Sequence, residues 1–391
     1  MTLSRAYECS KIERIVLGEQ APDQIAREAK RLNAQNVFLI CSQSLDSSSG
    51  ICASIKQVLG QTFAGAFTGI RGHSPRNGVI EAAKQARTSQ ADLLVSIGGG
   101  SQIDATKVIQ LCLDADVSSE EHLVEYASSI HKQPSRAIPE LKTPVIAVPT
   151  TLSGAEFGTI AGLSDPNTGT KEGYRSPNFA PTTILFDGEL ATHSPIDLWL
   201  SSAIRSLDHA AEGLCSASTF PYLDGCFTVA IRQLSLALPA AKSDPYNTAA
   251  RMLGFQAVWS VSPGVGQVTN GASHGLGYIL GAMGVAHGHT SCVLLPAVLT
   301  WNAAVNVDRQ EKIANALGAP GVAAGEATKQ FIAKLGLPTR LSEVGIHRTQ
   351  FAQIAEIGSK HPVVLGNPRP IEGPEDIIEI LEIAERGGVA S

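Results

Sequence analysis

The sequence predicts two domains: an α/β domain with a parallel sheet over residues 1–190, and an all-helical domain over residues 191–391. In the first half, short apolar runs alternate with amphipathic helical segments, the pattern of a parallel sheet covered by helices on both faces. After about residue 190, helical periodicity continues almost throughout, and no alternating strand pattern competes with it. A chain of 391 residues is long enough for two hydrophobic cores.

The first domain is expected to begin with a hairpin or strand pair within residues 1–20, ending at Gly18. The expected strands cover residues 36–41, 62–68, 93–97, 143–148 and 183–186. The expected helices cover residues 21–32, 51–59 and 79–87, and another follows the three glycines at 98–100. Residues 114–142 are more polar and are expected to form an excursion between sheet elements.

The strongest local signal is the junction between the strand at 93–97 and the helix that follows it. Three consecutive glycines at 98–100 connect them, and Ser101 is placed to cap the helix. Free N–H groups and the positive end of the helix dipole can hold a phosphate there, and glycines let the backbone approach it closely. Lys107 is two turns further along and could reach the ligand or a carboxylate. We therefore predict a phosphate or dinucleotide site, with an ordinary strand–helix turn as the alternative.

A second polar loop follows the strand at 143–148. It reads Pro-Thr-Thr-Leu-Ser-Gly-Ala-Glu over residues 149–156. The hydroxyl groups of Thr150, Thr151 and Ser153 could bond a phosphate, a ribose or an amide. A polar turn without a ligand is the alternative.

The second domain carries histidines in polar, glycine-rich surroundings. Its helical segments cover residues 198–216, 222–242, 248–260, 293–304, 308–317, 322–335 and 376–384. Arg205 and His209 are four residues apart on one of them and share a face, as do His274 and Tyr278. With His287, the histidines could form one site or bind zinc with an open position, and structural histidines are the alternative. The remaining histidines, among them His361, are expected to face solvent, and Arg369 is expected to anchor its loop through an ion pair.

Composition excludes several function classes. The net charge is −6 without any basic run, so we expect no nucleic-acid partner. No apolar run approaches the roughly 18–20 residues of a membrane span, and the N-terminus lacks the apolar core of a signal peptide. The seven cysteines include no Cys-x-x-Cys pair, which favours a reducing cytoplasm over disulfides or a cysteine-held metal.

These motifs together resemble the iron-containing, or group III, alcohol dehydrogenase superfamily, and most closely its maleylacetate reductase branch. The matching stretches, in family order, are residues 98–107, 149–156, 208–212, 274–282, 287–288 and 367–370. They span nearly the whole chain. The likeness to the branch rests on Arg71-Gly-His-Ser-Pro75 and on the altered metal site described below.

The resemblance implies a dehydroquinate-synthase-like fold with a Rossmann-like nucleotide-binding half, NAD(P)H-dependent carbonyl reduction and a homodimer. The cofactor contacts that it implies are Gly98, Gly99, Gly100, Ser101, Asp104, Lys107, Thr150, Thr151 and Ser153. An acid after the strand at 36–41 would hydrogen-bond the 2′-hydroxyl of the adenosine ribose and repel a 2′-phosphate. That position corresponds to Ser42, so we expect both NAD and NADP to be used.

The sequence departs from the family pattern at the metal site. Metal-dependent members of the superfamily use one Asp and three His, and the three His correspond to His209, His274 and His287. The Asp position is Arg205, whose guanidinium cannot ligate a cation and repels one at short range. Asp208 is not expected to substitute, because it lies about 100° from the Arg205–His209 face of the helix. A further active-site histidine of the family is replaced by Tyr278. This departure argues against bound iron or zinc.

We therefore expect an NAD(P)H-dependent, metal-independent reductase of a small oxo-acid or related carbonyl, similar to the maleylacetate reductases of aromatic catabolism. The expected catalytic residues are Arg205, His209, His274, Tyr278 and His287. Arg205 would stabilise the developing oxyanion or bind a substrate carboxylate, and a histidine or Tyr278 would donate the proton. The alternatives are a metal-dependent alcohol or aldehyde dehydrogenase, and a lyase or synthase that recycles its nicotinamide cofactor.

Overall fold

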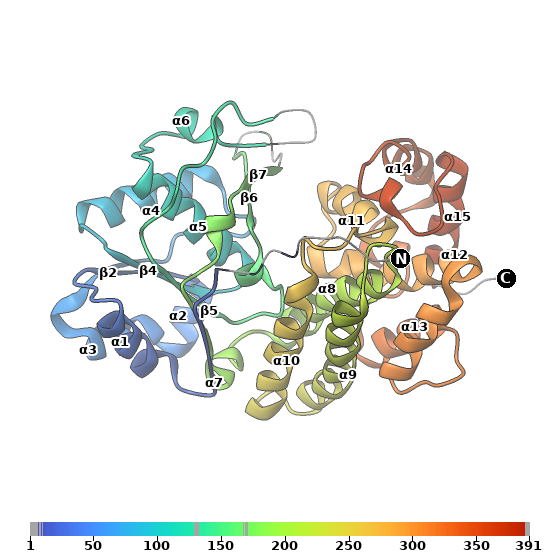
Figure 1. Ribbon diagram of the computed structural model, residues 1–391, viewed down its shortest axis with the longest axis horizontal. Helices are drawn as coiled ribbons and strands as arrows, with labels where there is room; N and C mark the ends of the chain where they lie inside the picture. Colours follow the sequence, from blue (N-terminus) through green and yellow to red (C-terminus); the bar gives the residue numbers. More distant parts are fainter. Residues whose placement is uncertain are drawn as a thin grey trace. The chain divides into compact units, whose positions relative to one another are not determined.

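The computed structural model describes residues 7, 9, 11–128, 133–166, 168 and 171–387. The chain divides into two compact units. An α/β unit comprises Cys9–Ser194, and a helical unit comprises Pro195–Ser391 together with Met1–Glu8 (Figure 1). The predicted boundary near residue 190 lies a few residues before this division.

The α/β unit is built on a six-stranded, fully parallel sheet with the order β1-β8-β5-β4-β2-β3. The strands are β1 Arg14–Leu17, β2 Val37–Cys41, β3 Phe63–Phe67, β4 Leu93–Gly98, β5 Val145–Pro149 and β8 Thr183–Phe186. Every residue of β2, β4 and β5 is buried, which explains their continuous apolar runs.

Helices cover both faces of this sheet (Figure 1). They are α1 Ala21–Arg31, α2 Gln43–Ser49, α3 Ile51–Leu59, α4 Arg76–Thr88, α5 Gly100–Asp114, α6 Glu120–Val124 and α7 Gly188–Ala191. Successive strand residues point to opposite faces, so Leu39 of β2 packs with α1 and α3, whereas Phe38 and Ile40 pack with α4 and α5. The parallel α/β fold predicted from the alternating pattern is therefore confirmed.

One local prediction in this unit is not met, and one element was not predicted. The described residues of the segment 1–20 form no hairpin but the strand β1, which pairs in parallel with β8 at the edge of the sheet. An unpredicted antiparallel hairpin follows β5, formed by β6 Ile160–Ser164 and β7 Lys171–Arg175. These strands carry glycines and charged residues at paired positions, with Gly162 opposite Gly173, and they lack a clear apolar alternation.

The helical unit contains helices that pack around one another without a sheet among its described residues (Figure 1). They are α8 Ile196–Cys215, α9 Pro221–Ser243, α10 Thr248–Val261, α11 Ala272–Ala282, α12 His287–Ala316, α13 Ala324–Lys334, α14 Phe351–Gly358 and α15 Pro374–Glu385. The all-helical prediction is confirmed. Two predicted helices merge into α12 across a kink at Asn306, and α11 and α14 lie outside the helical ranges named from the sequence.

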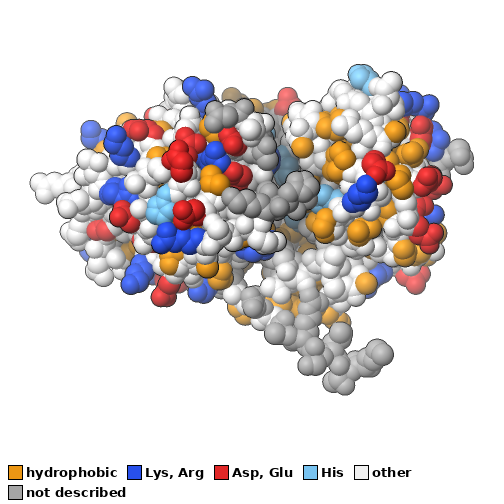
Figure 2. All heavy atoms as spheres, turned by 90° about the horizontal axis from the view of Figure 1, so that it is seen from above, with side chains coloured by type: hydrophobic (Ala, Val, Ile, Leu, Met, Phe, Trp, Pro, Cys, Tyr) orange, Lys and Arg blue, Asp and Glu red, His pale blue; other side chains and the backbone are white. Residues whose placement is uncertain are grey.

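By length and composition alone, helix α12 is long and apolar enough to cross a membrane. The sequence analysis did not predict this, because polar residues interrupt the apolar run. In the structure, 67% of the most apolar 18-residue stretch of α12 is buried inside the protein. Its residues Val293, Leu294 and Val298 belong to a core that also includes α11, α14 and α15. Burial of this kind is typical of the core helix of a folded domain. On the face shown in Figure 2, the coloured acidic and basic side chains are interspersed.

Candidate active site

Three predicted cofactor segments meet at the carboxyl edge of the parallel sheet. Gly98 at the end of β4 pairs with Pro149 at the end of β5, and the Thr150 N–H donates to the Gly98 carbonyl at 2.9 Å. The Ser42 N–H, after β2, donates to the Ile97 carbonyl at 3.1 Å. The chain leaves β2 toward one edge and β4 toward the other, so these loops lie at the topological switch point where such sheets bind nucleotides.

The glycine turn is pressed against the second polar loop. A Cβ on Gly99 would lie 3.1 Å from Cγ2 of Thr151, and a Cβ on Gly100 would lie 3.2 Å from Oγ of Ser153. Gly98 has a φ of +144°, a conformation that side chains rarely adopt. The turn and the hydroxyl-bearing loop thus form one surface at the start of α5, with the close backbone approach that a dinucleotide phosphate requires.

The Gly99→Ala variant is expected to raise the KM for NAD(P)H by about tenfold, because the methyl group must displace the Thr151 side chain by a few tenths of an ångström. Gly78→Ala in α4 is a matched control, since its Cβ would meet only ordinary contacts at 3.7–3.8 Å. Steady-state kinetics with varied cofactor compare the two variants. An unchanged KM in Gly99→Ala would argue against a cofactor phosphate at this turn.

Ser101 does not cap α5, contrary to the sequence prediction. The helix begins at Gly100 with Gly99 at the N-cap position, and no side chain caps it. Ser101 instead holds the segment at 71–75. Its Oγ accepts from the His73 N–H at 3.2 Å, and its carbonyl accepts from Ser74 Oγ at 2.8 Å. His73 and Ser74 have φ values of 63° and 49°, so the segment of the branch resemblance is strained where it meets the glycine turn.

Lys107 was predicted to reach the ligand or a carboxylate, and its Nζ lies 4.0 Å from Oδ1 of Asp104. Lys107 also supports the loop after Ser153. The side chain is 2% exposed, and Nζ donates to the carbonyls of Ala155, Gly158 and Ile160 at 2.6, 2.8 and 3.2 Å. Burial lowers the pKa of this ammonium group. Asp104, another predicted cofactor residue, accepts from the Gly162 N–H at 3.0 Å and so ties α5 to β6.

Glu156 is buried beside Lys107, and neither of its carboxylate oxygens has a hydrogen-bond partner among the described residues. Burial raises the pKa of this carboxyl group from 4.5 to about 7. The folded protein therefore keeps a proton that the unfolded chain releases, and the contribution of Glu156 to the free energy of unfolding falls as the pH rises through that window.

Glu156→Gln is expected to be more stable than the wild type above pH 7 by about 3 kcal/mol, at about 1.4 kcal/mol per pKa unit. The difference should disappear below pH 4.5, where both folded and unfolded wild-type chains carry the proton. Urea unfolding of both proteins at several pH values measures it. A difference that does not change with pH would mean that Glu156 is ionised in the folded state.

The helical unit gathers a second polar group on one face of α8. The members, spaced at i, i+3, i+4 and i+7, are Arg205, Asp208, His209 and Glu212. All but His209 are buried. Helix α11 adds Ser273, His274 and Tyr278, and α12 adds Ser291. The sequence prediction included Arg205, His209, His274 and Tyr278 but missed the other members.

Asp208 lies inside this cluster, contrary to the prediction that it points away. Its Oδ2 accepts from Ser291 Oγ at 2.6 Å and from Ser273 Oγ at 3.0 Å. It also lies 3.5 Å from Nη1 of Arg205 and 3.5 Å from Nδ1 of His274. Burial would raise the pKa of this carboxyl group, but His274 and Arg205 outweigh burial and hold the pKa below its ordinary value.

Arg205 is 4% exposed and points into the same group. Its Nη1 donates to Ser291 Oγ at 3.2 Å, and its Cζ lies 5.4 Å from the centre of the Tyr278 ring. Nη2 has no hydrogen-bond partner among the described residues. A Cβ on Gly277 would come within 3.4 Å of Nη1, so a glycine at that position leaves room for the guanidinium.

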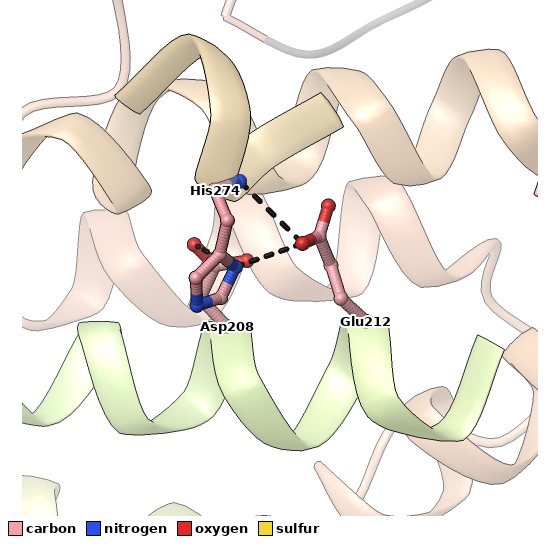
Figure 3. A group of neighbouring side chains, drawn as sticks. All are labelled: Asp208, Glu212 and His274. Atoms are coloured by element: carbon pink, nitrogen blue, oxygen red, sulfur yellow. Dashed lines mark hydrogen bonds and ion pairs between the residues drawn. The ribbon is translucent and has the colours of Figure 1, made fainter. Parts of the chain in front are cut away.

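Two histidines continue the chain of contacts away from the buried carboxylates. Figure 3 shows Asp208 and Glu212 on α8 facing His274, whose Nδ1 lies 2.8 Å from Oε2 of Glu212. Nε2 of His274 lies 2.9 Å from Nδ1 of His209. Burial opposes protonation of His274, but the carboxylates outweigh it and raise its pKa. Burial, with the charge of His274, lowers the pKa of His209 well below its ordinary value.

The outer members of the predicted group lie at its exposed edge. His287 is exposed, and its charge contributes to the lowered pKa of His209, so it lies near that ring. Tyr278 is 44% exposed, and its ring centre is 6.0 Å from that of His361. His361 is 8% exposed, so the prediction that it faces solvent is wrong.

Arg369 also differs from the prediction, since no ion pair involves it among the described residues. Its Nη1 donates to the Trp301 carbonyl at 2.8 Å, and its Cζ lies 3.7 Å from the centre of the Trp301 ring. The neighbouring Asn367 accepts from the Ala272 N–H at 3.1 Å. The proline-rich turn therefore supports the start of α11, which carries His274.

The cluster does not fit a one-Asp, three-His metal site. A guanidinium stands at the Asp position, and two histidine nitrogens of the set are hydrogen-bonded to each other. Asp208, Glu212 and His274 place ligand atoms within 4.8 Å of one another. However, Glu212 already accepts three backbone N–H groups and the imidazole, so a cation there would have to displace bonds that hold α11. We derive no step through a metal.

A sequence signal for the missed residues existed in the spacing along α8. Polar residues at i, i+3, i+4 and i+7 within an otherwise apolar helix mark one buried polar face. Glu212 and Asp208 are found by this criterion. Ser273 and Ser291 are not, because only the packing of α11 and α12 against α8 brings them to Asp208.

Family models match both units. The model described as iron-containing alcohol dehydrogenase covers residues 13–188, and the C-terminal model of the same family covers residues 200–384. The chain is 31% identical over 401 residues to dehydrogenase FUM7 of Gibberella moniliformis, covering 92% of this chain and 93% of the relative. It is 28% identical to a maleylacetate reductase of Burkholderia cepacia, covering 95% of each chain.

A solved structure agrees with these matches. The crystal structure of maleylacetate reductase from Rhizobium sp. superposes with a TM-score of 0.83 at 26% identity, covering 98% of this chain and 99% of that one. The named relatives and the matched family are oxidoreductases. The chain belongs to the iron-containing alcohol dehydrogenase family, near its maleylacetate reductase branch.

Proposed function

We propose that this protein is an NAD(P)H-dependent reductase of a small oxo-acid or related carbonyl compound, and that it works without a metal ion. The observation that carries the proposal is the buried guanidinium of Arg205 at the position of the family's metal-ligating carboxylate, paired with Asp208 and surrounded by histidines. Similarity to maleylacetate reductases supports an oxo-acid as the substrate class.

The cofactor fits the glycine cradle of the α/β unit. Gly99 and Gly100 allow the backbone to approach a pyrophosphate, and Thr151 and Ser153 present hydroxyl groups beside them. Ser42 offers no negative charge after β2, which is compatible with either NAD or NADP. The bound nicotinamide supplies the hydride.

The residues of the helical unit stabilise and protonate the carbonyl oxygen of the substrate. Arg205 carries a guanidinium with an uncommitted Nη2, so it stabilises negative charge that develops on that oxygen. His209 is the partly exposed end of the chain that starts at Glu212, and no described residue bonds its Nε2. His209 delivers the proton, with Tyr278 and His287 as the competing donors.

The alternatives remain distinguishable by chemistry. A metal-dependent dehydrogenase would carry about one metal per chain and lose activity with a chelator. A lyase or synthase would turn over its substrate without net change in nicotinamide absorbance. The metal-dependent dehydrogenase is the second candidate function, because the histidines of the family's metal site are retained.

The test combines elemental analysis of the purified protein with an NADH and NADPH oxidation screen over oxo-acids, including maleylacetate, and simple aldehydes. The proposal predicts oxo-acid reduction that resists chelation, in protein with far less than one metal per chain. Stoichiometric iron or zinc, together with a preference for aldehydes, would overturn it.

A further inference from the structure

The carboxylate of Glu212 accepts more hydrogen bonds than the carboxylate of Asp208, the other acid of the α8 cluster. Its Oε2 accepts from the Gly271 N–H at 2.8 Å, from the His274 N–H at 3.4 Å and from Nδ1 of His274 at 2.8 Å. Its Oε1 accepts from the Ser273 N–H at 2.8 Å. The side chain is only 4% exposed, so these bonds form away from water.

Part of this arrangement is structural. Helix α11 begins at Ala272 with Gly271 at its N-cap, and a glycine has no side chain to cap the free N–H groups. Glu212 supplies an acceptor from a different helix. A Cβ on Gly271 would lie 2.9 Å from Oε1 of Glu212, so the glycine is what lets the carboxylate approach. Asn367 also caps the start of α11, because its Oδ1 accepts from the Ala272 N–H.

The bond from Nδ1 of His274 to Glu212 has a different consequence. Because Nδ1 of His274 donates to Glu212, the ring is fixed with Nε2 toward His209, 2.9 Å from Nδ1 of that residue. If the ring turned over, a carbon atom would face His209 and the contact would be lost. Glu212 therefore determines which atom of His274 reaches His209.

We propose that Glu212 is a positioning residue for the reduction: it orients His274, and through His274 it orients His209 toward the substrate oxygen. The inference rests on the proposed function for its catalytic consequence, although the orientation itself does not. A carboxylate behind a histidine commonly fixes the ring and its tautomer in this way, and loss of such a partner typically costs about 10–100-fold in activity.

The experiment compares Glu212→Ala with Asn367→Ala. Alanine removes both carboxylate oxygens, and with them the acceptor for Nδ1 of His274 and the acceptors for the N–H groups at the start of α11. Asn367→Ala removes the other acceptor at the same helix start and touches neither histidine. Both variants are expected to lower the thermal midpoint. Only Glu212→Ala should lower kcat, by about 10–100-fold, with the KM for NAD(P)H within twofold of the wild type.

A second readout does not depend on activity. In protein labelled with ¹⁵N-histidine, the Nδ1–H of His274 should appear as a slowly exchanging, hydrogen-bonded proton, assigned with a His274→Asn variant. It should be lost or exchange rapidly in Glu212→Ala and persist in Asn367→Ala. A wild-type protein without this protected proton would overturn the inference even if no variant folded.

The outcomes separate the two proposals. If the wild type reduces no carbonyl compound but shows the protected proton, the proposed function fails and the orientation by Glu212 stands. If both variants lose kcat in proportion to their lost stability, and the proton persists in Glu212→Ala, Glu212 is only a helix cap.

Discussion

Arg205→Ala is expected to lower kcat for carbonyl reduction by about 10²–10³-fold, the usual cost of removing one preorganised donor from a developing oxyanion. The KM for NAD(P)H should stay near the wild-type value, because Arg205 belongs to the helical unit and the cofactor cradle to the α/β unit. Steady-state oxidation of NADH with the best oxo-acid of the screen measures both constants. Arg205→Lys keeps a charge without the planar fork, so we expect an intermediate loss.

The Arg205→Ala variant also leaves Asp208 buried beside fewer positive charges, which costs about 3–5 kcal/mol when a buried pair is broken. The double variant Arg205→Met with Asp208→Asn removes both charges and separates lost catalysis from lost folding. It should be folded by circular dichroism and remain inactive. If Arg205→Ala keeps full turnover, Arg205 does not stabilise the transition state, and the central observation of the proposed function is lost.

Arg205→Asp restores the carboxylate that metal-dependent relatives carry at this position. This variant should lose oxo-acid reduction and is the one substitution expected to increase the binding of iron or zinc, measured by elemental analysis. His274 would have to give up its bond to His209 for that purpose. Unchanged metal content in Arg205→Asp would show that the rest of the cluster, and not Arg205 alone, has diverged from a metal site.

Sequence patterns predicted the elements whose burial is nearly complete. Strands β2, β4 and β5 are buried at every residue, so an apolar run bounded by polar turns is sufficient to find them. The hairpin of β6 and β7 was missed because its pairing depends on long-range contacts, such as Asp104 with the Gly162 N–H, rather than on apolar alternation. The partner of β1 lies far along the chain in β8, which no local pattern reveals.

The site was predicted only where residue type alone carried chemistry. Arg205 was found because it stands where the resemblance implies a metal-ligating Asp, and His209 and His274 because they lie in polar surroundings and correspond to histidines of that site. The spacing argument failed for Asp208, because residues three apart on a helix share a face almost as well as residues four apart. Lys107 was predicted to reach the ligand or a carboxylate; it lies 4.0 Å from Asp104, and its ammonium group also donates to buried carbonyl groups of the loop after Ser153, which no local pattern reveals.

His209→Gln is expected to lower kcat by about 10²–10⁴-fold, the range for losing a general acid at the reacting oxygen. His209 is half-buried at the end of the contacts that run from Glu212 through His274. Its lowered pKa keeps the ring neutral, so the proton that His209 passes from Nε2 to the substrate oxygen is replaced at Nδ1 by a proton from His274, whose pKa is raised. Tyr278→Phe and His287→Gln are the matched comparisons, since both side chains lie at the exposed edge of the same cluster and should cost less than tenfold.

The variant that loses the most activity identifies the proton donor. If Tyr278→Phe or His287→Gln loses more activity than His209→Gln, the proton comes from that residue, and the chain from Glu212 to His209 has a different role. A solvent deuterium isotope effect on kcat sharpens the comparison, because it should rise in the variant whose proton transfer has become limiting. An increase confined to His209→Gln would agree with a proton delivered along the contacts that Glu212 holds in place.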